Sequence, residues 1–561
     1  MINVKYTKPT KLACPQEIEV SFRYKQSIVD AIRLLPDRYW DAKNKIWHLS
    51  YDCLSALQKA LPNEEFNIEG KPIDNKKYGE KIIEKHYELP KGLKTKPYEH
   101  QIVGFNEMMN FNKFLLLDSP GVGKSLQIIA VALKRKELSG IKHCLIVCGV
   151  NSLKFNWQEE IKIHAGMDSV ILGARKNKKG VIEVKSNKDK LEDLDNLNEF
   201  FIITNIETFR DKVIKDKLKK LVDKKVIEMI VFDECHKCRQ PQAQQTRGIM
   251  SVAKNVKYFY GLTGTVLSNS PLDAFVPLKL VEKENANFTN FKSRYCVYGG
   301  WGGFSIVGYR HLDELQAKLN MVSLRRTKED VLDLPPKTYT VNYVELNTKQ
   351  RKIYNDVMKS ILEHIDEVSV SPSPLSQLIR LRQATADTSI LSSTIQESAK
   401  FERLDEILEE QISNNEKVVV FSNWTTVTDR LVQRYDKYNP AVITGEIKDR
   451  QTQKDKFMTD DSCKLLIGTI SAMGTGLTLT VATTAVFVDE PYTWANYEQA
   501  SDRIYRIGQK KNVTIISLLA KDTIDERVHK IMLNKKHISE AIVDNQYNLK
   551  DRKILEWLIG G

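Results

Sequence analysis

The stretch Val231-Phe232-Asp233-Glu234-Cys235-His236 ends a run of apolar residues with two adjacent carboxylates. Upstream, the stretch Asp118-Ser-Pro-Gly-Val-Gly-Lys-Ser125 follows the apolar run 114–117 with a glycine-rich turn that can open a helix. A strand, a turn and a helix in this order form the context that a phosphate-binding loop requires. Further β-like runs feed loops in the alternating pattern of a parallel α/β sheet, whose ligands bind beyond the carboxyl ends of the strands.

The glycine-rich turn has the residue types that bind the phosphates of ATP. Its small residues leave room for backbone N–H groups to curl around the β-phosphate, Lys124 supplies a positive charge, and the Ser125 hydroxyl can ligate Mg²⁺. The usual pattern G-x-x-x-x-G-K-[ST] is broken at its first position, where Asp118 replaces glycine. This departure argues against a nucleotide kinase or a small GTPase and favours a helicase-type loop. The turn residues expected to contact the nucleotide are Pro120, Gly121, Val122 and Gly123.

The carboxylate pair supplies what the loop lacks for hydrolysis. Asp233 is expected to hold Mg²⁺ from the side opposite Ser125, and Glu234 to orient or deprotonate the attacking water. An isolated Gly-x-Gly-Lys-Ser can be a plain turn, and the Asp-Glu pair makes that reading much weaker. We therefore expect Lys124, Asp233 and Glu234 to act in catalysis.

Two further segments indicate that the ATPase is a motor. Thr263-Gly264-Thr265 follows the carboxylate pair, and Gln499-Ala-Ser-Asp-Arg503-Ile-Tyr-Arg506-Ile-Gly-Gln509 comes far downstream. Arg503 and Arg506 are three residues apart, so we expect them to lie on one face of a helix. From that face they are expected to reach a phosphate presented by another domain.

These segments, in this order, resemble a Swi/Snf-family DNA translocase of helicase superfamily two over about residues 95–540. The resemblance implies an α/β fold with two tandem RecA-like lobes, each a parallel sheet flanked by helices, with helical insertions and a small α+β N-terminal domain. The segment from Leu324 to Lys337 is similar to a block peculiar to this family, which separates it from ordinary DEAD/DEAH-box helicases. Val266 and Trp494 replace prolines that are customary in the family, so local loop shape is expected to differ.

The resemblance also implies roles for residues that chemistry alone does not single out. Gln101 matches the glutamine that reads adenine, and two glycines of the second lobe's coupling loop are expected to contact the nucleotide: Gly474 and Gly476. Residues expected to couple the nucleotide to movement are His236, Thr263, Thr265 and Gln499. Residues expected to contact DNA in the two lobes are Thr204, Asn205 and Thr469.

Residues 1–68 are expected to form a small separate unit. It contains a β-like run at Ile18–Phe22 and an amphipathic stretch from Tyr24 to Leu35, and its second half resembles the HARP-type module of annealing-helicase relatives. Exposed aromatics in such a module would sense DNA structure, and the candidates are Trp40 and Trp47. The alternative is that both merely fill a small core, because aromatic residues usually pack.

The remaining boundaries follow from the positions of the motifs. We expect a charged linker at 69–94, the ATP-binding lobe 1 at 95–281, family-specific helical insertions and a linker at 282–397, lobe 2 at 398–525, and a helical brace at 526–561. A chain of 561 residues suits three or four domains.

Composition agrees with a protein that binds nucleic acid. The chain has 42% hydrophobic and 28% charged residues, a formal charge of +13 and a pI near 9.0, which favour a polyanionic partner. Eight cysteines do not form a disulfide framework in a chain of this size. Cys235 and Cys238 suggest a zinc site as an alternative, but no second pair follows at zinc spacing. Without a signal segment or an apolar run long enough to span a bilayer, we expect a cytoplasmic or nucleoid-associated protein of a bacterial or phage-infected cell.

These observations predict a monomeric, ATP- and Mg²⁺-dependent translocase on double-stranded DNA, with forked or bubble DNA as a possible preferred substrate. Two other functions stay open: a strand-separating superfamily-two helicase, and an ATP-gated DNA-structure sensor or recruitment module. Stimulation of ATP hydrolysis by duplex, single-stranded and forked DNA, followed by triplex displacement, separates them.

Overall fold

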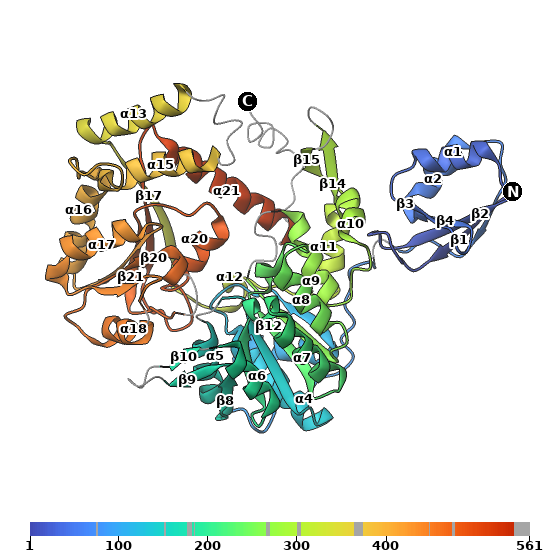
Figure 1. The fold of residues 1–561 in the computed structure, drawn as a ribbon, viewed down its shortest axis with the longest axis horizontal. Coiled ribbons are helices and arrows are strands. Elements are labelled where there is room, and N and C mark those ends of the chain that lie inside the picture. Colours follow the sequence, from blue (N-terminus) through green and yellow to red (C-terminus); the bar gives the residue numbers. More distant parts are fainter. Residues whose placement is uncertain are drawn as a thin grey trace. The chain divides into compact units, whose positions relative to one another are not determined.

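The structure is a computed structural model of the chain. It describes residues 1–74, 77–150, 153–176, 182–184, 186–264, 270–299, 305–363, 374–447, 449–473 and 477–543 (Figure 1). These residues fall into two compact units. The first contains Met1–Ser119, Lys124–Arg326 and the described residues from Ile538 onward, and the second contains Pro120–Gly123 and Thr327–His537.

The first unit begins with a small mixed sheet, the N-terminal module (residues 2–69). Its five strands lie in the order β3-β4-β2-β1-β5, with β1 and β5 parallel and the other pairs antiparallel. The amphipathic stretch forms a helix as expected, and Ile28 and Ile32 bury its apolar face. The elements are β1 (Ile2–Thr7), β2 (Glu17–Phe22), α1 (Gln26–Leu34), β3 (Arg38–Asp41), β4 (Ile46–Ser50), α2 (Leu54–Ala60) and β5 (Phe66–Glu69).

The loop between β1 and β2 docks the module onto the rest of the first unit. The buried Glu17 carboxylate shapes this loop by accepting hydrogen bonds from three successive backbone N–H groups, at 2.8–2.9 Å. The carbonyl of Ala13 then accepts hydrogen bonds from the Tyr295 hydroxyl (3.1 Å) and the Lys318 ammonium (2.8 Å). Arg294, 2% exposed, pairs with Asp37 and Asp52 of the module and with Glu314. Such a buried charge needs its partners, so the module is tied to this unit by more than a linker.

Lobe 1 is built on a parallel sheet of seven strands in the order β16-β6-β13-β12-β7-β11-β8. Successive strand residues alternate between two apolar clusters, one on each face: Leu115 and Leu145 lie in one, and Phe114 and Ile146 in the other. Both faces of the sheet are therefore buried, as in parallel α/β folds.

The strands of this part of the first unit are β6 (Lys113–Leu116), β7 (His143–Cys148), β8 (Ser169–Ile171), β9 (Ala174–Lys176), β10 (Ile182–Val184), β11 (Phe201–Asn205), β12 (Ile227–Asp233), β13 (Tyr258–Leu262), β14 (Cys296–Gly299), β15 (Ser305–Tyr309) and β16 (Ser323–Leu324). The helices are α3 (Glu99–Asn110), α4 (Lys124–Ser139), α5 (Leu153–Ala165), α6 (Asn187–Asp195), α7 (Lys212–Asp223), α8 (Gln244–Ala253), α9 (Phe275–Leu280), α10 (Phe288–Tyr295) and α11 (Leu312–Asn320).

Lobe 2, in the second unit, is built on a parallel sheet of six strands in the order β17-β22-β21-β18-β20-β19. The strands are β17 (Lys337–Val344), β18 (Lys417–Ser422), β19 (Ala441–Ile443), β20 (Leu465–Thr469), β21 (Ala482–Phe487) and β22 (Val513–Ala520). The helices are α12 (Lys328–Val331), α13 (Thr348–Glu363), α15 (Pro374–Ala386), α16 (Ala399–Ser413), α17 (Thr425–Arg434), α18 (Arg450–Thr459), α19 (Ile470–Met473), α20 (Trp494–Ser501) and α21 (Ile524–Val543).

The edge strands differ from the boundaries expected from the sequence. The range 282–397 was assigned to helical insertions and a linker, yet β16 pairs with β6 at the edge of the lobe 1 sheet, and β17 pairs with β22 at the edge of the lobe 2 sheet. Parallel edge strands pair with residues far away in the chain, and no local turn signal announces them.

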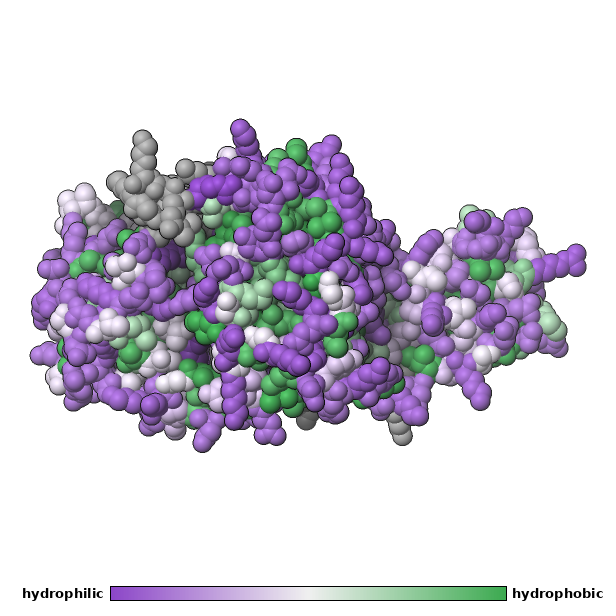
Figure 2. All heavy atoms as spheres, turned by 90° about the horizontal axis from the view of Figure 1, so that it is seen from below, coloured by the Kyte–Doolittle hydropathy of each residue, from purple (hydrophilic) through white to green (hydrophobic). Residues whose placement is uncertain are grey.

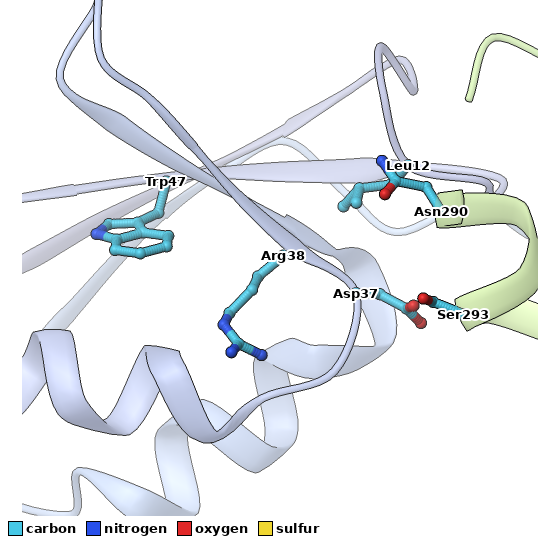
Figure 3. Close-up of a pocket in the computed structure, with 6 residues that line it drawn as sticks. All are labelled: Leu12, Asp37, Arg38, Trp47, Asn290 and Ser293. Carbon is cyan, nitrogen blue, oxygen red and sulfur yellow. The ribbon is translucent and has the colours of Figure 1, made fainter. Parts of the chain in front are cut away.

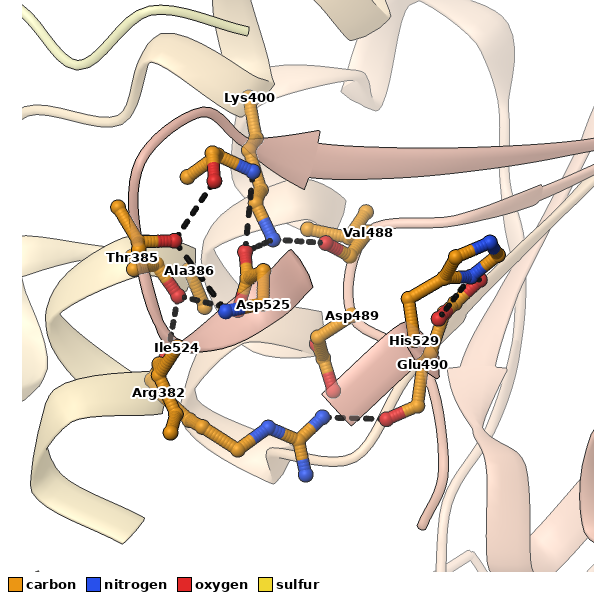
Figure 4. Close-up of polar contacts among 12 residues, drawn as sticks. Arg382, Thr385, Ala386, Lys400, Val488, Asp489, Glu490, Ile524, Asp525 and His529 are labelled. Carbon is orange, nitrogen blue, oxygen red and sulfur yellow. Dashed lines mark hydrogen bonds and ion pairs between the residues drawn. The ribbon is translucent and has the colours of Figure 1, made fainter. Parts of the chain in front are cut away.

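A buried polar network ties α15, α16 and α21 to the carboxyl end of β21 (Figure 4). The Lys400 ammonium lies 2.6 Å from an Asp525 carboxylate oxygen and donates to the carbonyl of Val488 at 2.8 Å. Both side chains of the pair are almost fully buried. Nearby, the Arg382 guanidinium donates to the carbonyl of Glu490, whose carboxylate pairs with His529.

Replacing Lys400 with methionine should destabilise the second unit strongly. It keeps most of the side-chain volume but leaves the Asp525 carboxylate buried without its cation, a change that costs about 3–5 kcal/mol. Hydrogen exchange of peptides from α16 and α21 under increasing urea measures the loss. Lys349→Met is the matched control, because the Lys349–Glu397 pair is exposed and should shift nothing measurable. Equal protection in both variants would contradict a structural role for Lys400.

The face shown in Figure 2 is mostly hydrophilic, with small, scattered hydrophobic areas. Within the described part of the chain, no helix is long and apolar enough to cross a membrane. All eight cysteines are free thiols, and each is buried.

Candidate nucleotide site

The glycine-rich turn lies between β6 and α4, as the sequence predicts. Gly121 and Gly123 have φ angles of +86° and +81°, in the left-handed region that glycine adopts without strain. Helix α4 begins at Lys124, immediately after the turn. The free N–H groups of a helix N-terminus favour an anion such as a phosphate.

The Lys124 side chain lies folded over the start of the turn. Its ammonium donates hydrogen bonds to the carbonyls of Asp118 (2.7 Å) and Ser119 (3.1 Å). Burial lowers the pKa of Lys124, while the nearby carboxylates, Glu234 first among them, act in the opposite direction. A phosphate would replace these two neutral carbonyls as the partner of the ammonium and satisfy its charge better.

Asp118, which stands where the phosphate-loop pattern has glycine, anchors the turn. Its fully buried carboxylate pairs with the Arg326 guanidinium, with Nε–Oδ1 at 3.1 Å and Nη2–Oδ2 at 2.5 Å. The Gln127 amide donates to the same carboxylate at 3.3 Å. Arg325 donates to the carbonyls of Leu117 (2.9 Å) and Gly264 (3.0 Å). The departure at the first position is therefore a buried ion pair with the Leu324–Lys337 block, which the sequence alone did not reveal.

The carboxylate pair ends strand β12. Trp157 of α5 donates its indole N–H to Asp233 Oδ2 at 2.9 Å, and the N–H of Glu234 donates to Asp233 Oδ1 at 2.9 Å. Burial and the neighbouring Glu234 charge raise the pKa of Asp233. Glu234 has a φ angle of +53°, which turns its side chain out of the strand direction. Such a conformation in a non-glycine residue is typical of active sites.

His236 connects the carboxylate pair to the next strand. Its Nδ1 lies 3.2 Å from a Glu234 carboxylate oxygen and 2.8 Å from the hydroxyl of Thr263, which follows β13. The Glu234 carboxylate is buried, which raises its pKa, but the hydrogen bond from His236 and the surrounding cations outweigh burial and lower it. The His236 ring thus lies where it favours the carboxylate form of Glu234, which is the form that a general base requires.

Gly149 leaves the space that Glu234 occupies. Its N–H donates to the carbonyl of Asp233 at 2.8 Å. A Cβ at this position would lie 2.7 Å from the carbonyl oxygen of Glu234 and 2.9 Å from that of Asp233, so a larger residue would displace the backbone that carries the carboxylate pair. Trp157 and Gly149 both belong to the segment that follows β7, and their contacts show that this segment holds the carboxylate pair in place.

The structure does not favour the zinc alternative. Cys235 and Cys238 are buried, and burial raises the pKa of both thiols, whereas zinc binds the thiolate. Among the described residues, no three His, Cys, Asp or Glu side chains are arranged to hold a metal ion. A magnesium ion bound mainly through phosphates and water requires fewer protein ligands than such a cluster.

The other predicted residues of lobe 1 lie at the edges of these elements. Gln101, buried in the first turn of α3, accepts a hydrogen bond from the N–H of Tyr98 at 2.9 Å. Thr204 is 1% exposed, and its hydroxyl donates to that of Thr208 at 2.9 Å. The Asn205 amide donates to Glu207 at 2.7 Å. Of the two predicted DNA contacts in this lobe, Asn205 is the more accessible.

The two arginines lie in the second unit, but not on a helix. Helix α20 ends at Ser501, and Arg503 and Arg506 follow it in an irregular turn. The expectation of one helical face was therefore wrong. Their guanidinium groups nevertheless converge, because Nη1 of each donates to the carbonyl of Leu477, at 3.3 Å from Arg503 and 3.0 Å from Arg506.

Gln499 lies on α20 and Thr469 at the carboxyl end of β20, where Thr469 is nearly buried. Three predicted site residues lie outside the described residues: Thr265, Gly474 and Gly476.

Comparisons with known proteins identify the family of the chain. The sequence matches the SNF2-related domain over residues 98–395 and the helicase conserved C-terminal domain over residues 399–508. A Mycoplasma pneumoniae protein described as an uncharacterized ATP-dependent helicase is 27% identical over 459 residues, which cover 80% of this chain and 42% of that protein. The chain thus spans less than half the length of this relative.

For a second relative, the match covers a larger share of the relative's own length. It is the Caenorhabditis elegans homologue of SWI/SNF-related matrix-associated actin-dependent regulator of chromatin subfamily A-like protein 1, 26% identical over 550 residues, which cover 92% of this chain and 74% of the relative. Among solved structures, the Sulfolobus solfataricus SWI2/SNF2 ATPase core in complex with dsDNA matches 84% of this chain and 97% of its own, with 24% identity and a TM-score of 0.38. Because the SNF2-related match extends over more than half of its residues, the chain belongs to the SNF2-related, or Swi/Snf, family of ATP-dependent enzymes.

Proposed function

We propose that this protein hydrolyses ATP to translocate along double-stranded DNA. The observation that carries the proposal is the cluster at the carboxyl ends of β6, β12 and β13, where Lys124, Asp233 and Glu234 lie together in one unit. This is the edge of a parallel sheet at which ligands bind. Together with the family match, it supports an ATP site with its own general base.

In this proposal the chain's own residues divide the chemistry of hydrolysis. Lys124 binds the phosphates, and Glu234, in contact with His236, accepts the proton of the attacking water. The Ser125 hydroxyl and the Asp233 carboxylate are hard oxygen ligands of the type that Mg²⁺ prefers. When bound, Mg²⁺ neutralises charge on the β- and γ-phosphates. Trp157 holds Asp233 in place through its indole N–H.

Arg503 and Arg506 stabilise the charge that develops on the γ-phosphate in the proposed mechanism. His236 contacts Glu234 and lies 2.8 Å from the hydroxyl of Thr263, which follows β13. Through these contacts a change at Glu234 during hydrolysis moves the end of β13. Alternating grip on DNA by the two lobes then converts each cycle of ATP hydrolysis into a step. The net charge of +13 supports a polyanionic track.

Duplex translocation is tested by comparing DNA cofactors at one salt concentration. We expect duplex DNA to stimulate ATP hydrolysis and the protein to displace a triplex-forming strand from duplex DNA, without unwinding the duplex. Stimulation by single strands alone with strand separation would favour a strand-separating helicase. Forked-DNA binding that is ATP-dependent but yields no triplex displacement would favour a structure sensor.

We further propose that the N-terminal module makes the protein prefer forked or bubble DNA. Trp40 and Trp47 are cross-strand partners in β3 and β4, with ring centroids 5.2 Å apart. Trp40 is 46% exposed, whereas Trp47 also packs against the module core. The two alternatives drawn from the sequence thus apply to different residues: Trp47 packs, and Trp40 offers an exposed ring.

A pocket of about 310 Å³ lies beside Trp47, where the module meets α10 (Figure 3). Its lining combines an aromatic ring, a guanidinium, a carboxylate that pairs with Arg294, two small polar groups and one apolar side chain: Leu12, Asp37, Arg38, Trp47, Asn290 and Ser293. An aromatic face next to a cation suits an unpaired base and its phosphate, neither of which an intact duplex offers in this form. This chemistry supports the preference for unpaired DNA.

Trp40→Ala should lower affinity for forked DNA about fivefold or more, because a lost base stack costs about 1–3 kcal/mol. Affinity for plain duplex, which rests on phosphate contacts, should change less. Titrations of both DNAs at a single salt concentration measure the difference. Tyr24→Ala is the control, because Tyr24 is an exposed aromatic of the same module.

A point variant is a cleaner test than deletion of the module. Without residues 1–68, Arg294 would lose Asp37 and Asp52, and Lys318 would lose the carbonyl of Ala13. Loss of fork binding by deletion would therefore mix DNA contact with damage to lobe 1. An equal fall of Trp40→Ala on both DNAs would make Trp40 part of a general anchor, and no fall on either would leave the module a packing or partner-binding element.

A further inference from the structure

We propose that Lys328 is a positioning residue for ATP hydrolysis, because it fixes the turn that carries Arg503 and Arg506. The inference rests on the role proposed above for these arginines. The starting observation is that both follow the end of α20 in an irregular segment. Local backbone hydrogen bonds hold part of this turn, such as the one from the N–H of Arg503 to the carbonyl of Ala500 at 3.1 Å. Contacts with residues distant in the chain add to them.

Lys328 supplies such contacts on both sides of Arg503. Its ammonium lies 2.5 Å from the carboxylate of Asp502 and donates to the carbonyl of Tyr505 at 2.7 Å. Asp502 directly precedes Arg503, and Tyr505 directly precedes Arg506. One buried cation therefore contacts the residue immediately before each of the two arginines, through the side chain of Asp502 and the backbone carbonyl of Tyr505.

The burial of this contact makes it stronger than a surface ion pair. The side chains of Lys328 and Asp502 are 5% and 2% exposed. Burial lowers the pKa of Lys328 to about 8, and Asp502 opposes this effect. A buried ion pair holds its geometry only if its remaining donors and acceptors are also paired. The carbonyl of Tyr505 meets that need for Lys328.

Lys337 shares one of the two contacts, which makes it a useful comparison. Its ammonium lies 3.0 Å from the same carboxylate oxygen of Asp502. Both lysines also lie over the Tyr505 ring, at 5.1 and 5.0 Å from its centroid. The carbonyl of Tyr505 accepts its hydrogen bond from Lys328. We therefore expect Lys328 to fix the path of the turn and Lys337 mainly to neutralise Asp502.

The far side of the turn is fixed by backbone and side-chain contacts with residues 477–479. The N–H of Leu479 donates to the carbonyl of Arg503 at 2.9 Å, and both guanidinium groups donate to the carbonyl of Leu477. Lys328 holds the opposite side. Loss of Lys328 would remove the hydrogen bond to the carbonyl of Tyr505 and leave Lys337 as the partner of Asp502, so the guanidinium groups would be less well positioned but would keep their charge. A misplacement of about 1 Å can cost about 10²-fold in rate.

The test is a double-mutant cycle on the full chain with saturating duplex DNA. We expect Lys328→Met to lower kcat about 10- to 100-fold while KM for ATP changes less than about threefold. In the Arg506→Ala background, Lys328→Met should lower kcat by much less than it does in the parent. Non-additivity of this kind shows that two residues act through one interaction, and a merely structural loss would not produce it.

Two further variants complete the design. Lys328→Arg keeps a cation that can reach both the carboxylate and the carbonyl, so it should recover most of the lost turnover. Lys349→Met, the exposed lysine of α13, should leave kcat and KM unchanged. If Lys328→Met yields too little folded protein, Asp502→Asn removes the ion pair with little change in shape, and its cycle with Arg506→Ala is expected to show the same non-additivity.

Different results would contradict the positioning role of Lys328 and the catalytic role of the arginines. Parental kcat in Lys328→Met, or full additivity of the two losses, would overturn the positioning role of Lys328. Parental kcat in Arg506→Ala would instead remove the role of the arginine itself. In that case a loss in Lys328→Met would have to arise elsewhere, and the positioning role would fail with it.

Discussion

Glu234→Gln should abolish most ATP hydrolysis while ATP and Mg²⁺ still bind. General bases typically contribute about 10²–10⁴-fold to a rate, and kcat should fall by that amount. The reason lies in the setting of the side chain. Glutamine has the same shape and can still accept the hydrogen bond from His236, but it cannot take a proton from water. The φ angle of +53° that directs residue 234 out of the strand stays the same.

A paired variant distinguishes loss of chemistry from loss of binding. Lys124→Ala removes the ammonium that would bind the phosphates, so ATP affinity itself should fall. Glu228→Gln, at the start of the same strand β12, is the matched control and should behave like the parent. Equilibrium binding of a fluorescent ATP analogue and single-turnover hydrolysis measure the two quantities separately. Parental hydrolysis by Glu234→Gln would assign the base to another residue.

The core of this site could be predicted from the sequence because its signals are local. An apolar run, a glycine turn and Lys124-Ser125 are adjacent in the chain, so strand β6, the turn and helix α4 follow from neighbouring residues. The same holds for the apolar strand that ends in Asp233-Glu234. In both cases the residues that fix the fold are also the residues of the site.

The contacts that refine the site were not predictable in this way. In the sequence, Asp118 only departs from the phosphate-loop pattern. In the structure it pairs with Arg326, which lies 208 positions later in the chain. The indole of Trp157 reaches Asp233 from a different helix. Only the fold brings these residues together, because hydrogen bonds between distant positions leave no periodic trace in the sequence.

At Arg503 and Arg506 the local sequence suggested a helix that the structure does not have. Residues Gln499 to Arg506 have a composition compatible with a helix, and spacing by three suggested a single helical face. The helix stops at Ser501, and the residue that follows it contacts distant parts of the chain, because the Asp502 carboxylate pairs with Lys328 and Lys337. Tertiary contacts outweighed local helix propensity, which amounts to less than about 1 kcal/mol per residue.

Arg506→Ala should reduce DNA-stimulated turnover by about a thousandfold or more with nearly unchanged ATP affinity, because a guanidinium at the γ-phosphate matters once charge develops there. Arg506 is a cleaner target than Arg503, which is nearly buried and also donates to the carbonyl of Gln499. Arg403→Ala, on the exposed side of α16, serves as the control and should hydrolyse ATP normally.

The competing explanation is that Arg506 only braces the loop at Leu477, whose carbonyl it contacts at 3.0 Å. A brace and a catalytic cation respond differently to Arg506→Lys. A lysine supplies a point charge without the planar fork, so a catalytic role predicts a partial recovery of kcat. A purely structural role predicts lower thermal stability in Arg506→Ala with parental kcat at a temperature where the protein is folded. Turnover measured beside thermal unfolding therefore decides between them, and a stable variant with a thousandfold lower kcat would leave the brace without support.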